Sequence, residues 1–277
     1  MSYVLLGGPA SGKSSLLVAL YGALVNHRAG NLRLVRTIDE VEFLSRGLIA
    51  FGEQESLQRT DAGSTARLLV EVARGDEVVE LEVPDRSGEL LKEMLNARTW
   101  HPELREQIRK AHGAMFFVRA DRYDPGESSD AVAELLSPGA DDDEPSRHDN
   151  DPVPWTAALM PSDARAVDLL QAALAERDKV LPIAIIISAW DRVPPPDPAP
   201  PAWLAQNMPL LDQFLDCSSD RLPHAVFGVS AQGGDFSAGL AAGLDDEDPW
   251  DRAFVIGPDE KRRTLAEPVS WLLDATP

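Results

Sequence analysis

The stretch Ser2-Tyr3-Val4-Leu5-Leu6-Gly7-Gly8-Pro9-Ala10-Ser11-Gly12-Lys13-Ser14 decides the fold of this chain. Its first residues form a short apolar run, and glycines follow directly. Residues 15–25 then have the pattern of an amphipathic helix. Gly7, Gly12, Lys13 and Ser14 stand at the spacing G-x-x-x-x-G-K-[ST] of a phosphate-binding P-loop. The strand, loop and helix around that spacing are the context that the motif requires.

Each residue type in this loop has a physical reason. Glycines let the backbone curl so that successive N–H groups point at one anion, and the helix adds its positive end. Lys13 can reach the β- and γ-phosphates, and the Ser14 hydroxyl can ligand Mg²⁺. The alternative is a glycine turn before an ordinary helix. We predict nucleoside triphosphate binding, with phosphate contacts from Gly7, Gly8, Ala10, Ser11, Gly12, Lys13, Ser14 and Ser15.

Composition excludes several other classes of protein. The formal net charge is −20, from 46 acidic and 26 basic residues, so nucleic acid and anionic membranes are repelled. Cys217 is the single cysteine, which excludes internal disulfides and cysteine-rich metal sites. The apolar stretch from Val180 to Trp190 is too short to span a bilayer, and the chain starts directly with a strand. We therefore expect a cytoplasmic protein without a membrane span.

The rest of the chain alternates strands and helices. Strands are expected at residues 31–35, 66–73, 78–83, 114–118, 181–188 and 225–229, and the second and third of these form a hairpin. Helices are expected near 38–50, 89–97, 102–111, 162–179 and 203–217, with another at the C-terminus. This order predicts a three-layer α/β P-loop NTPase fold, a mostly parallel sheet with one antiparallel edge strand and helices on both faces.

Polar stretches interrupt this pattern. We expect one domain over residues 1–277 with insertions at 36–58, 124–161 and 234–263. The longest is rich in Asp, Pro, Ser and Gly, and its acidic run at 141–144 is typical of a solvated segment rather than a metal site.

Three further motifs stand at expected strand ends, where ligands bind in such sheets. They are Asp85-Arg86-Ser87-Gly88, Ser188-Ala189-Trp190-Asp191 and Ser230-Ala231-Gln232. A carboxylate near Ser14, such as Asp85, is what a phosphate-bound Mg²⁺ needs, although an Asp after Pro84 also starts turns. Asp191 could accept both N1–H and the 2-amino group of guanine, or could simply cap a helix.

In this order the motifs resemble those of the small GTPase-like class of P-loop proteins. The resemblance implies that Asp85 binds Mg²⁺, that the Gly88 amide contacts the γ-phosphate, and that a switch threonine closes over the metal. Thr65 is best placed for that last role, with Thr60 and Ser64 as competitors. It also implies base contacts from Asp191, Ser230 and Ala231. The extra segments resemble the bacterial double-GTPase type of domain, which is associated with multi-component systems.

Three positions depart from that class. Ala189 replaces the lysine of N-K-x-D, which removes a side chain that stacks on the base. Gln232 replaces the lysine of S-A-K, and Glu89 stands where relatives carry a water-orienting glutamine or histidine. Because the Glu89 carboxylate would face a γ-phosphate of the same sign, we expect slow hydrolysis, with Lys13, Gly88 and Glu89 as the residues around the reacting phosphate.

Three functions remain open on the sequence. The first is a Mg²⁺-dependent GTPase that binds GTP and GDP and acts as a switch for an unidentified protein effector or regulator. The second is a P-loop ATPase or kinase, in which Asp191 is merely structural. The third is an interaction module that binds a nucleotide without turning it over.

Overall fold

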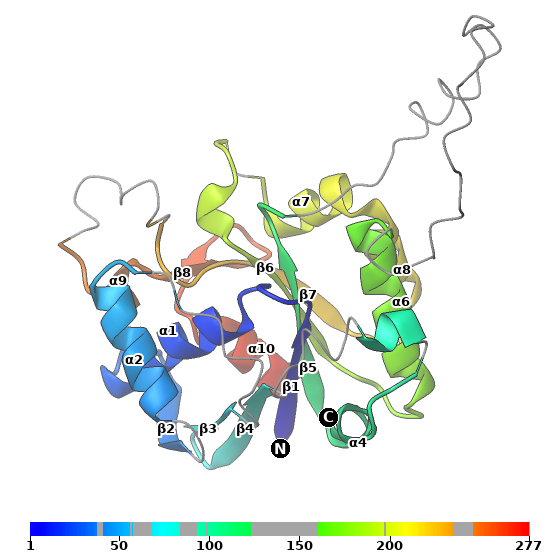
Figure 1. The fold of residues 1–277 in the computed structure, drawn as a ribbon, viewed down its shortest axis with the longest axis horizontal. Helices are drawn as coiled ribbons and strands as arrows, with labels where there is room; N and C mark the ends of the chain where they lie inside the picture. The colour runs from blue at the N-terminus through cyan, green and yellow to red at the C-terminus, as the bar shows by residue number, and fades with distance from the viewer. Residues whose placement is uncertain are drawn as a thin grey trace, which may run out of the picture.

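A single mixed sheet organises the computed structural model of the chain (Figure 1). The structure describes residues 1–37, 41–55, 57, 68–83, 93–97, 99–122, 160–196, 198–234, 236 and 246–276. Within these ranges the sheet has the strand order β2-β3-β4-β1-β5-β6-β7-β8-β9. The strands are β1 (Ser2–Gly7), β2 (Arg33–Thr37), β3 (Leu68–Arg74), β4 (Glu77–Val83), β5 (Gly113–Arg119), β6 (Ile183–Ser188), β7 (His224–Ser230), β8 (Phe254–Ile256) and β9 (Arg262–Arg263).

The centre of the sheet is parallel. β4, β1, β5, β6 and β7 all run in one direction, so their carboxyl ends meet at one edge. The sequences of β1, β5, β6 and β7 are largely apolar because both faces are covered, and all six residues of β6 are buried. β4 differs, since Glu80 and Glu82 alternate with its apolar residues. The loops after β1, β5, β6 and β7 therefore gather on the same side of the molecule.

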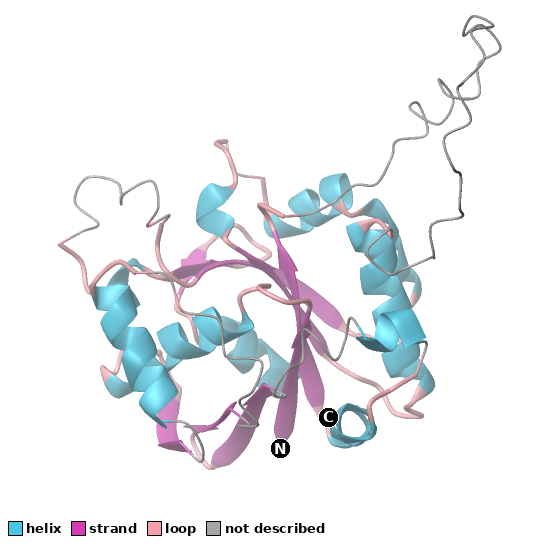
Figure 2. Ribbon diagram, in the orientation of Figure 1, coloured by secondary structure: helices cyan, strands magenta, loops and turns pink. Residues whose placement is uncertain are grey.

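Helices cover both faces of the sheet, which gives the three layers of Figure 2. α1 (Lys13–Val25), α2 (Val41–Gly52) and α10 (Glu267–Ala275) pack on one face, together with the short α9 (Pro249–Arg252). α4 (Pro102–Lys110), α6 (Ser162–Ala175), α7 (Pro200–Asn207) and α8 (Pro209–Cys217) pack on the other. Alternate residues of β1, β5, β6 and β7 feed the two cores, as Leu5 and Leu6 do.

The three-layer α/β fold expected from the sequence is confirmed, and its element boundaries differ only locally. α6 ends at Ala175, four residues before the expected end, and β2 begins at Arg33. Only residues 93–97 of the helix expected at 89–97 are described, and they are helical. The expected insertion at 124–161 lies almost entirely outside the described residues.

The edges of the sheet differ from the expectation of one antiparallel edge strand. β3 is antiparallel to β4, as the hairpin predicts, but β2 pairs along its outer side and forms the edge. The ion pair between Arg36 and Glu71, 2.6 Å from Nε to Oε2, crosses these two strands. At the other edge β8 is a second antiparallel strand, followed by β9. Strands of three and two residues are too short to give a readable alternation, so the sequence pattern missed them.

No helix among the described residues is both long enough and apolar enough to cross a membrane.

A tight contact between β7 and the loop after β6 shapes the edge where the carboxyl ends meet. Trp190 follows β6, is 1% exposed and packs edge-on against Trp203, with ring centroids 6.4 Å apart. Its indole lies flat on Gly228 of β7, where a Cβ atom would stand 2.3 Å from Trp190 Cδ2. Only glycine fits there.

We expect Gly228→Ala to lower the free energy of unfolding by about 1–3 kcal/mol, because the added methyl overpacks the contact. Urea unfolding measures the change. Gly52→Ala is the matched control, since a Cβ at Gly52 meets no atom within 4 Å. Equal stability of the two variants would contradict this packing.

Candidate functional site

The loop between β1 and α1 is wound tightly enough to need glycine. Gly7 and Gly12 have φ values of 151° and 95°, and Ala10 adopts the left-handed region at 56°. A Cβ on Gly12 would stand 2.9 Å from the Cβ of Ser188 at the end of β6. Both the dihedral and the close approach therefore require glycine at this position. α1 begins at the next residue, with its free amides facing the loop.

The side chain of Lys13 folds into this loop. Its Nζ donates to the carbonyl oxygens of Gly7 and Gly8, at 2.7 and 2.9 Å, and to Ser11 Oγ at 3.2 Å. The residue is 8% exposed, and burial lowers its pKa to about 8. Among the described residues no carboxylate pairs with this ammonium group. A buried cation held by neutral oxygens beside a helix N-terminus fits an anionic ligand.

The remaining loop residues leave the site open. Gly8 and Ala10 are exposed, and Ser14 and Ser15 are half-buried on the first turn of α1. The Ser14 hydroxyl is chemically suited to a hard cation held against phosphate. The other predicted ligands, Thr65 and Asp85, lie outside the described residues, as do Gly88 and Glu89. Within the described ranges no cluster of three His, Cys, Asp or Glu side chains could hold a metal ion.

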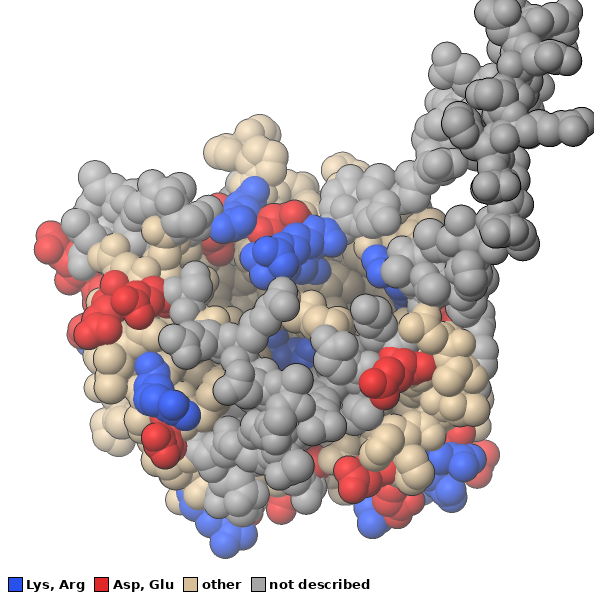
Figure 3. Space-filling view, viewed as in Figure 1, with Lys and Arg blue, Asp and Glu red and all other residues tan. Residues whose placement is uncertain are grey.

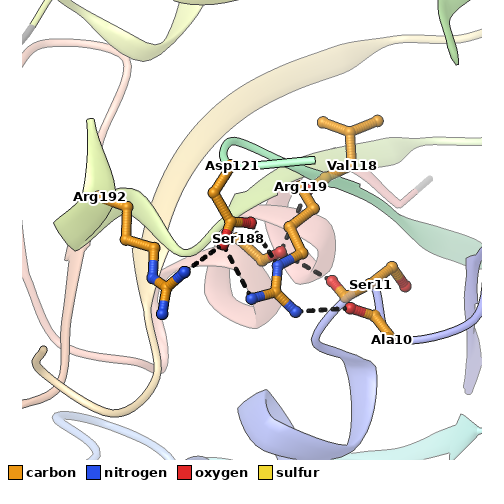
Figure 4. A network of polar contacts seen from close by, with 7 residues as sticks. All are labelled: Ala10, Ser11, Val118, Arg119, Asp121, Ser188 and Arg192. Carbon is orange, nitrogen blue, oxygen red and sulfur yellow. Dashed lines mark hydrogen bonds and ion pairs between the residues drawn. The ribbon is translucent and has the colours of Figure 1, made fainter. Parts of the chain in front are cut away.

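Ser188 ties the loop to the sheet. It is buried at the end of β6. Its Oγ lies within donating distance of two backbone carbonyl oxygens, that of Ser11 at 2.8 Å and that of Val118 at 3.1 Å (Figure 4). One hydroxyl therefore joins the loop, β5 and β6. Because a buried carbonyl needs a partner, losing this hydroxyl would release the loop.

Asp191 stands one turn further, on the 3-10 helix Trp190–Arg192. Asp191 Oδ1 accepts a hydrogen bond from Ser230 Oγ at 2.6 Å. Ser230 Oγ in turn accepts a hydrogen bond from the backbone amide of Gly233 at 3.1 Å. Ser230 is fully buried, so it fixes the carboxylate from behind. A direct contact between Ser230 and a base stays a prediction.

A pocket connects these two groups of residues. It runs along the carboxyl ends of the strands from Gly12 and Ser15 to Asp191 and Ala231, and Figure 3 shows basic side chains gathered over this hollowed face. It is also lined by Leu16, Phe117, Arg119, Ser188, Ala189, Arg192, Val229, Gln232 and Gly234. Residues of the P-loop lie at one end of the pocket, and the carboxylate of Asp191 lies at the other.

Two arginines frame the pocket around one acid. Figure 4 shows Arg119 and Arg192 on either side of Asp121. Arg119 Nε and Nη2 lie 2.5 and 3.0 Å from the two Asp121 oxygens, and Arg192 Nη1 lies 2.7 Å from Oδ2. Burial alone would raise the pKa of Asp121, but the two guanidiniums outweigh it and hold that pKa below its usual range.

The sequence motifs mark the two ends of the pocket but not its middle. Arg119 and Asp121 follow β5 at the same edge as the recognised motifs, so their place after a buried strand was the available signal. Arg192 is adjacent to Asp191 and belongs to the same turn. Ser188 begins the motif at residues 188–191, but its contact with the loop follows only from the register of β5 against β6.

A search of solved structures returned matches that include three GTPase-related proteins with low sequence identity. Toc33 from Arabidopsis thaliana, in complex with GDP and Mg²⁺, is 13% identical with a TM-score of 0.41, and the match covers 100% of this chain and 84% of that one. The S. cerevisiae Ski7 GTPase-like domain, bound to GTP, is 10% identical with a TM-score of 0.42, covering 100% and 50%. Sup35 complexed with GDP is 12% identical with a TM-score of 0.35. That match covers 84% of this chain and only 37% of the Sup35 chain.

A comparison with curated proteins found no match. A family model does match: the model described as Double-GTPase 1 aligns with residues 4–272, from the first strand to the last helix. The sequence had suggested a resemblance to this type of domain, and the match confirms it. The chain belongs to the Double-GTPase 1 family, and therefore to the GTPase-type P-loop proteins.

Proposed function

We propose that this chain binds GTP and GDP in the pocket between the P-loop and Asp191, and hydrolyses GTP as a Mg²⁺-dependent switch. The observation that carries this proposal is the arrangement along one edge of the sheet. Gly12 and Ser15 line one end of the pocket and the anchored carboxylate of Asp191 lines the other. Beside the loop, the buried ammonium of Lys13 has no carboxylate partner among the described residues. These groups are complementary to the phosphates and to the Watson–Crick edge of guanine.

At the phosphate end, Lys13 exchanges its carbonyl partners for the β- and γ-phosphate oxygens. The loop amides and the first turn of α1, with Ser14 and Ser15, surround the same charge. Burial makes this exchange favourable, because the ammonium gains a charged partner in a site where water screens little. The backbone of the loop from Gly7 to Gly12 curls around the position proposed for the phosphates.

At the base end, Asp191 accepts the N1–H and the 2-amino group of guanine. Adenine has no 2-amino group, and its N1 is an acceptor that meets the carboxylate unfavourably. Ser230 orients the carboxylate without neutralising it. Ala231 lies on the same pocket wall, and its backbone is a further candidate for a base contact.

Hydrolysis is the part of the proposal that draws on residues outside the described ranges. Water attacks the γ-phosphorus, the bond to the β–γ bridging oxygen breaks, and GDP and phosphate leave. Gly88 and Glu89 are proposed beside the γ-phosphate. Ser14, Thr65 and Asp85 are proposed to hold Mg²⁺, which neutralises charge on the phosphates when bound. The switch acts on an unidentified partner protein, in the cytoplasm, as part of a multi-protein bacterial system.

The low pKa of Lys13 gives nucleotide binding a pH dependence. Phosphate binding stabilises the charged form and raises the pKa of Lys13, so affinity is highest below the free-state pKa of about 8. Above that value the free protein must take up a proton, and GDP affinity should fall about tenfold between pH 7 and pH 9. Calorimetry in buffers of different ionisation enthalpy would detect the proton uptake directly.

Lys13→Arg is the control for this effect, because a guanidinium stays charged throughout the range. The GDP affinity of this variant should not change between pH 7 and pH 9, whether that affinity is higher or lower than that of wild type. A wild-type affinity that is equally flat would contradict the role of Lys13.

The base preference tests the other end of the pocket. We expect wild type to bind GTP at least about tenfold more tightly than ATP, since the mismatch costs at least about 1.4 kcal/mol. Asp191→Asn presents a donor in place of one acceptor and should remove most of that preference. Titration with both nucleotides and Mg²⁺ measures it.

Asp220→Asn is the matched control, an exposed aspartate after α8 that does not line the pocket. It should keep the wild-type preference. Equal GTP and ATP affinities in wild type would favour the ATPase function instead, and GTP binding without phosphate release would favour the interaction module.

A further inference from the structure

Arg119 lines the pocket that lies between the P-loop and Asp191. It is the last residue of β5, opposite Ser188 in the register with β6. Its Nη1 donates to the carbonyl oxygen of Ala10 at 3.1 Å, which brings the guanidinium over the P-loop. The same side chain lines the pocket together with Asp191. Arg119 therefore spans the gap between the phosphate end and the base end.

The plane of this guanidinium is fixed. Asp121 accepts from Nε and Nη2 with its two oxygens, a two-point contact that sets orientation as well as position. Arg192 holds Asp121 from the opposite side, and the depressed pKa of that carboxyl keeps it ionised at neutral pH. Because Asp121 and Ala10 engage the N–H edges of Arg119, the group can offer a ligand one of its flat faces. Its side chain is 25% exposed.

The neighbouring wall lacks a side chain that could cover a base. Ala189 ends in a methyl group and stands where the resemblance to GTPases expects a lysine that stacks on the base. Its backbone is in the left-handed region at φ 57°. A planar, weakly hydrated guanidinium stacks well on an aromatic ring, and the ring face attracts its positive charge.

We propose that Arg119, oriented by Asp121, stacks its guanidinium on the purine ring of the bound nucleotide and replaces the side chain that Ala189 lacks. The inference rests on the proposed function, since it assumes a guanine nucleotide in this pocket. Asp191 then sets which base is bound, and Arg119 sets how tightly any purine is held.

The test separates the base from the phosphates. Calorimetry with Mg²⁺ compares GDP with inorganic tripolyphosphate, which has no base, for wild type and Arg119→Ala. Arg119→Lys keeps the charge and loses the plane, and Asp121→Asn loosens the orientation. Arg105→Ala is the matched control, an arginine on α4 ion-paired with Glu176 at 2.7 Å and remote from the pocket. Thermal unfolding of each variant checks that it folds.

We expect Arg119→Ala to weaken GDP about tenfold, as a stacking contact of moderate strength would, and to leave tripolyphosphate unchanged. Arg119→Lys and Asp121→Asn should weaken GDP in the same direction, and Arg105→Ala should not. The ratio of GTP to ATP affinity should survive in Arg119→Ala.

Two results would overturn the inference while the proposed function stands. One is that the Arg119→Ala variant binds GDP as tightly as wild type does. The other is an equal loss for GDP and tripolyphosphate, which would mean that Arg119 acts through the phosphate loop. A wild-type chain that binds no guanine nucleotide would instead overturn the proposed function, and the inference with it.

Discussion

The P-loop is wound around one buried charge. The ammonium of Lys13 is held among the carbonyl and hydroxyl oxygens of its own loop, and no carboxylate in the described residues balances it. Such a group is costly to bury, and the cost appears as a pKa lowered to about 8. Gly7 and Gly12 permit the tight loop that surrounds it, and Ser188 fastens that loop to the sheet. An anion in the loop would relieve the cost, so the free protein is prepared for a phosphate.

The parallel sheet turns this local feature into a larger site. Because β1, β5, β6 and β7 end at the same edge, residues far apart in sequence share one pocket. Ser230 and Gly233 fix the carboxylate of Asp191, and Trp190 packed on Gly228 fixes the turn that carries it. The buried Arg252 donates to the carbonyl oxygen of Gln232 and so supports the loop after β7, which also lines the pocket. Rigid packing behind each functional group is what allows a small pocket to discriminate between ligands.

The sequence predicted those parts of the fold and site that have a strong local pattern. The P-loop spacing, the buried strand at residues 183–188 and the hairpin were visible because their periodicity or glycine pattern is distinctive. β8 and β9 were missed because a two- or three-residue strand has no period, and its pairing with β7 is tertiary. The network of Arg119, Asp121 and Arg192 is also tertiary, because only the register of neighbouring strands brings these residues together, and the sequence pattern therefore missed it. Thr65, Asp85, Gly88 and Glu89 stay predictions.

The most direct test of the central claim is a crystal structure of this chain with GDP and Mg²⁺. The account predicts the β-phosphate within hydrogen-bond distance of Lys13 Nζ, with the carbonyls of Gly7 and Gly8 released as its partners. It also predicts the guanine edge on the carboxylate of Asp191, with Ser230 still bonded behind it. A nucleotide bound with Lys13 unmoved, or with its base turned away from Asp191, would contradict the account.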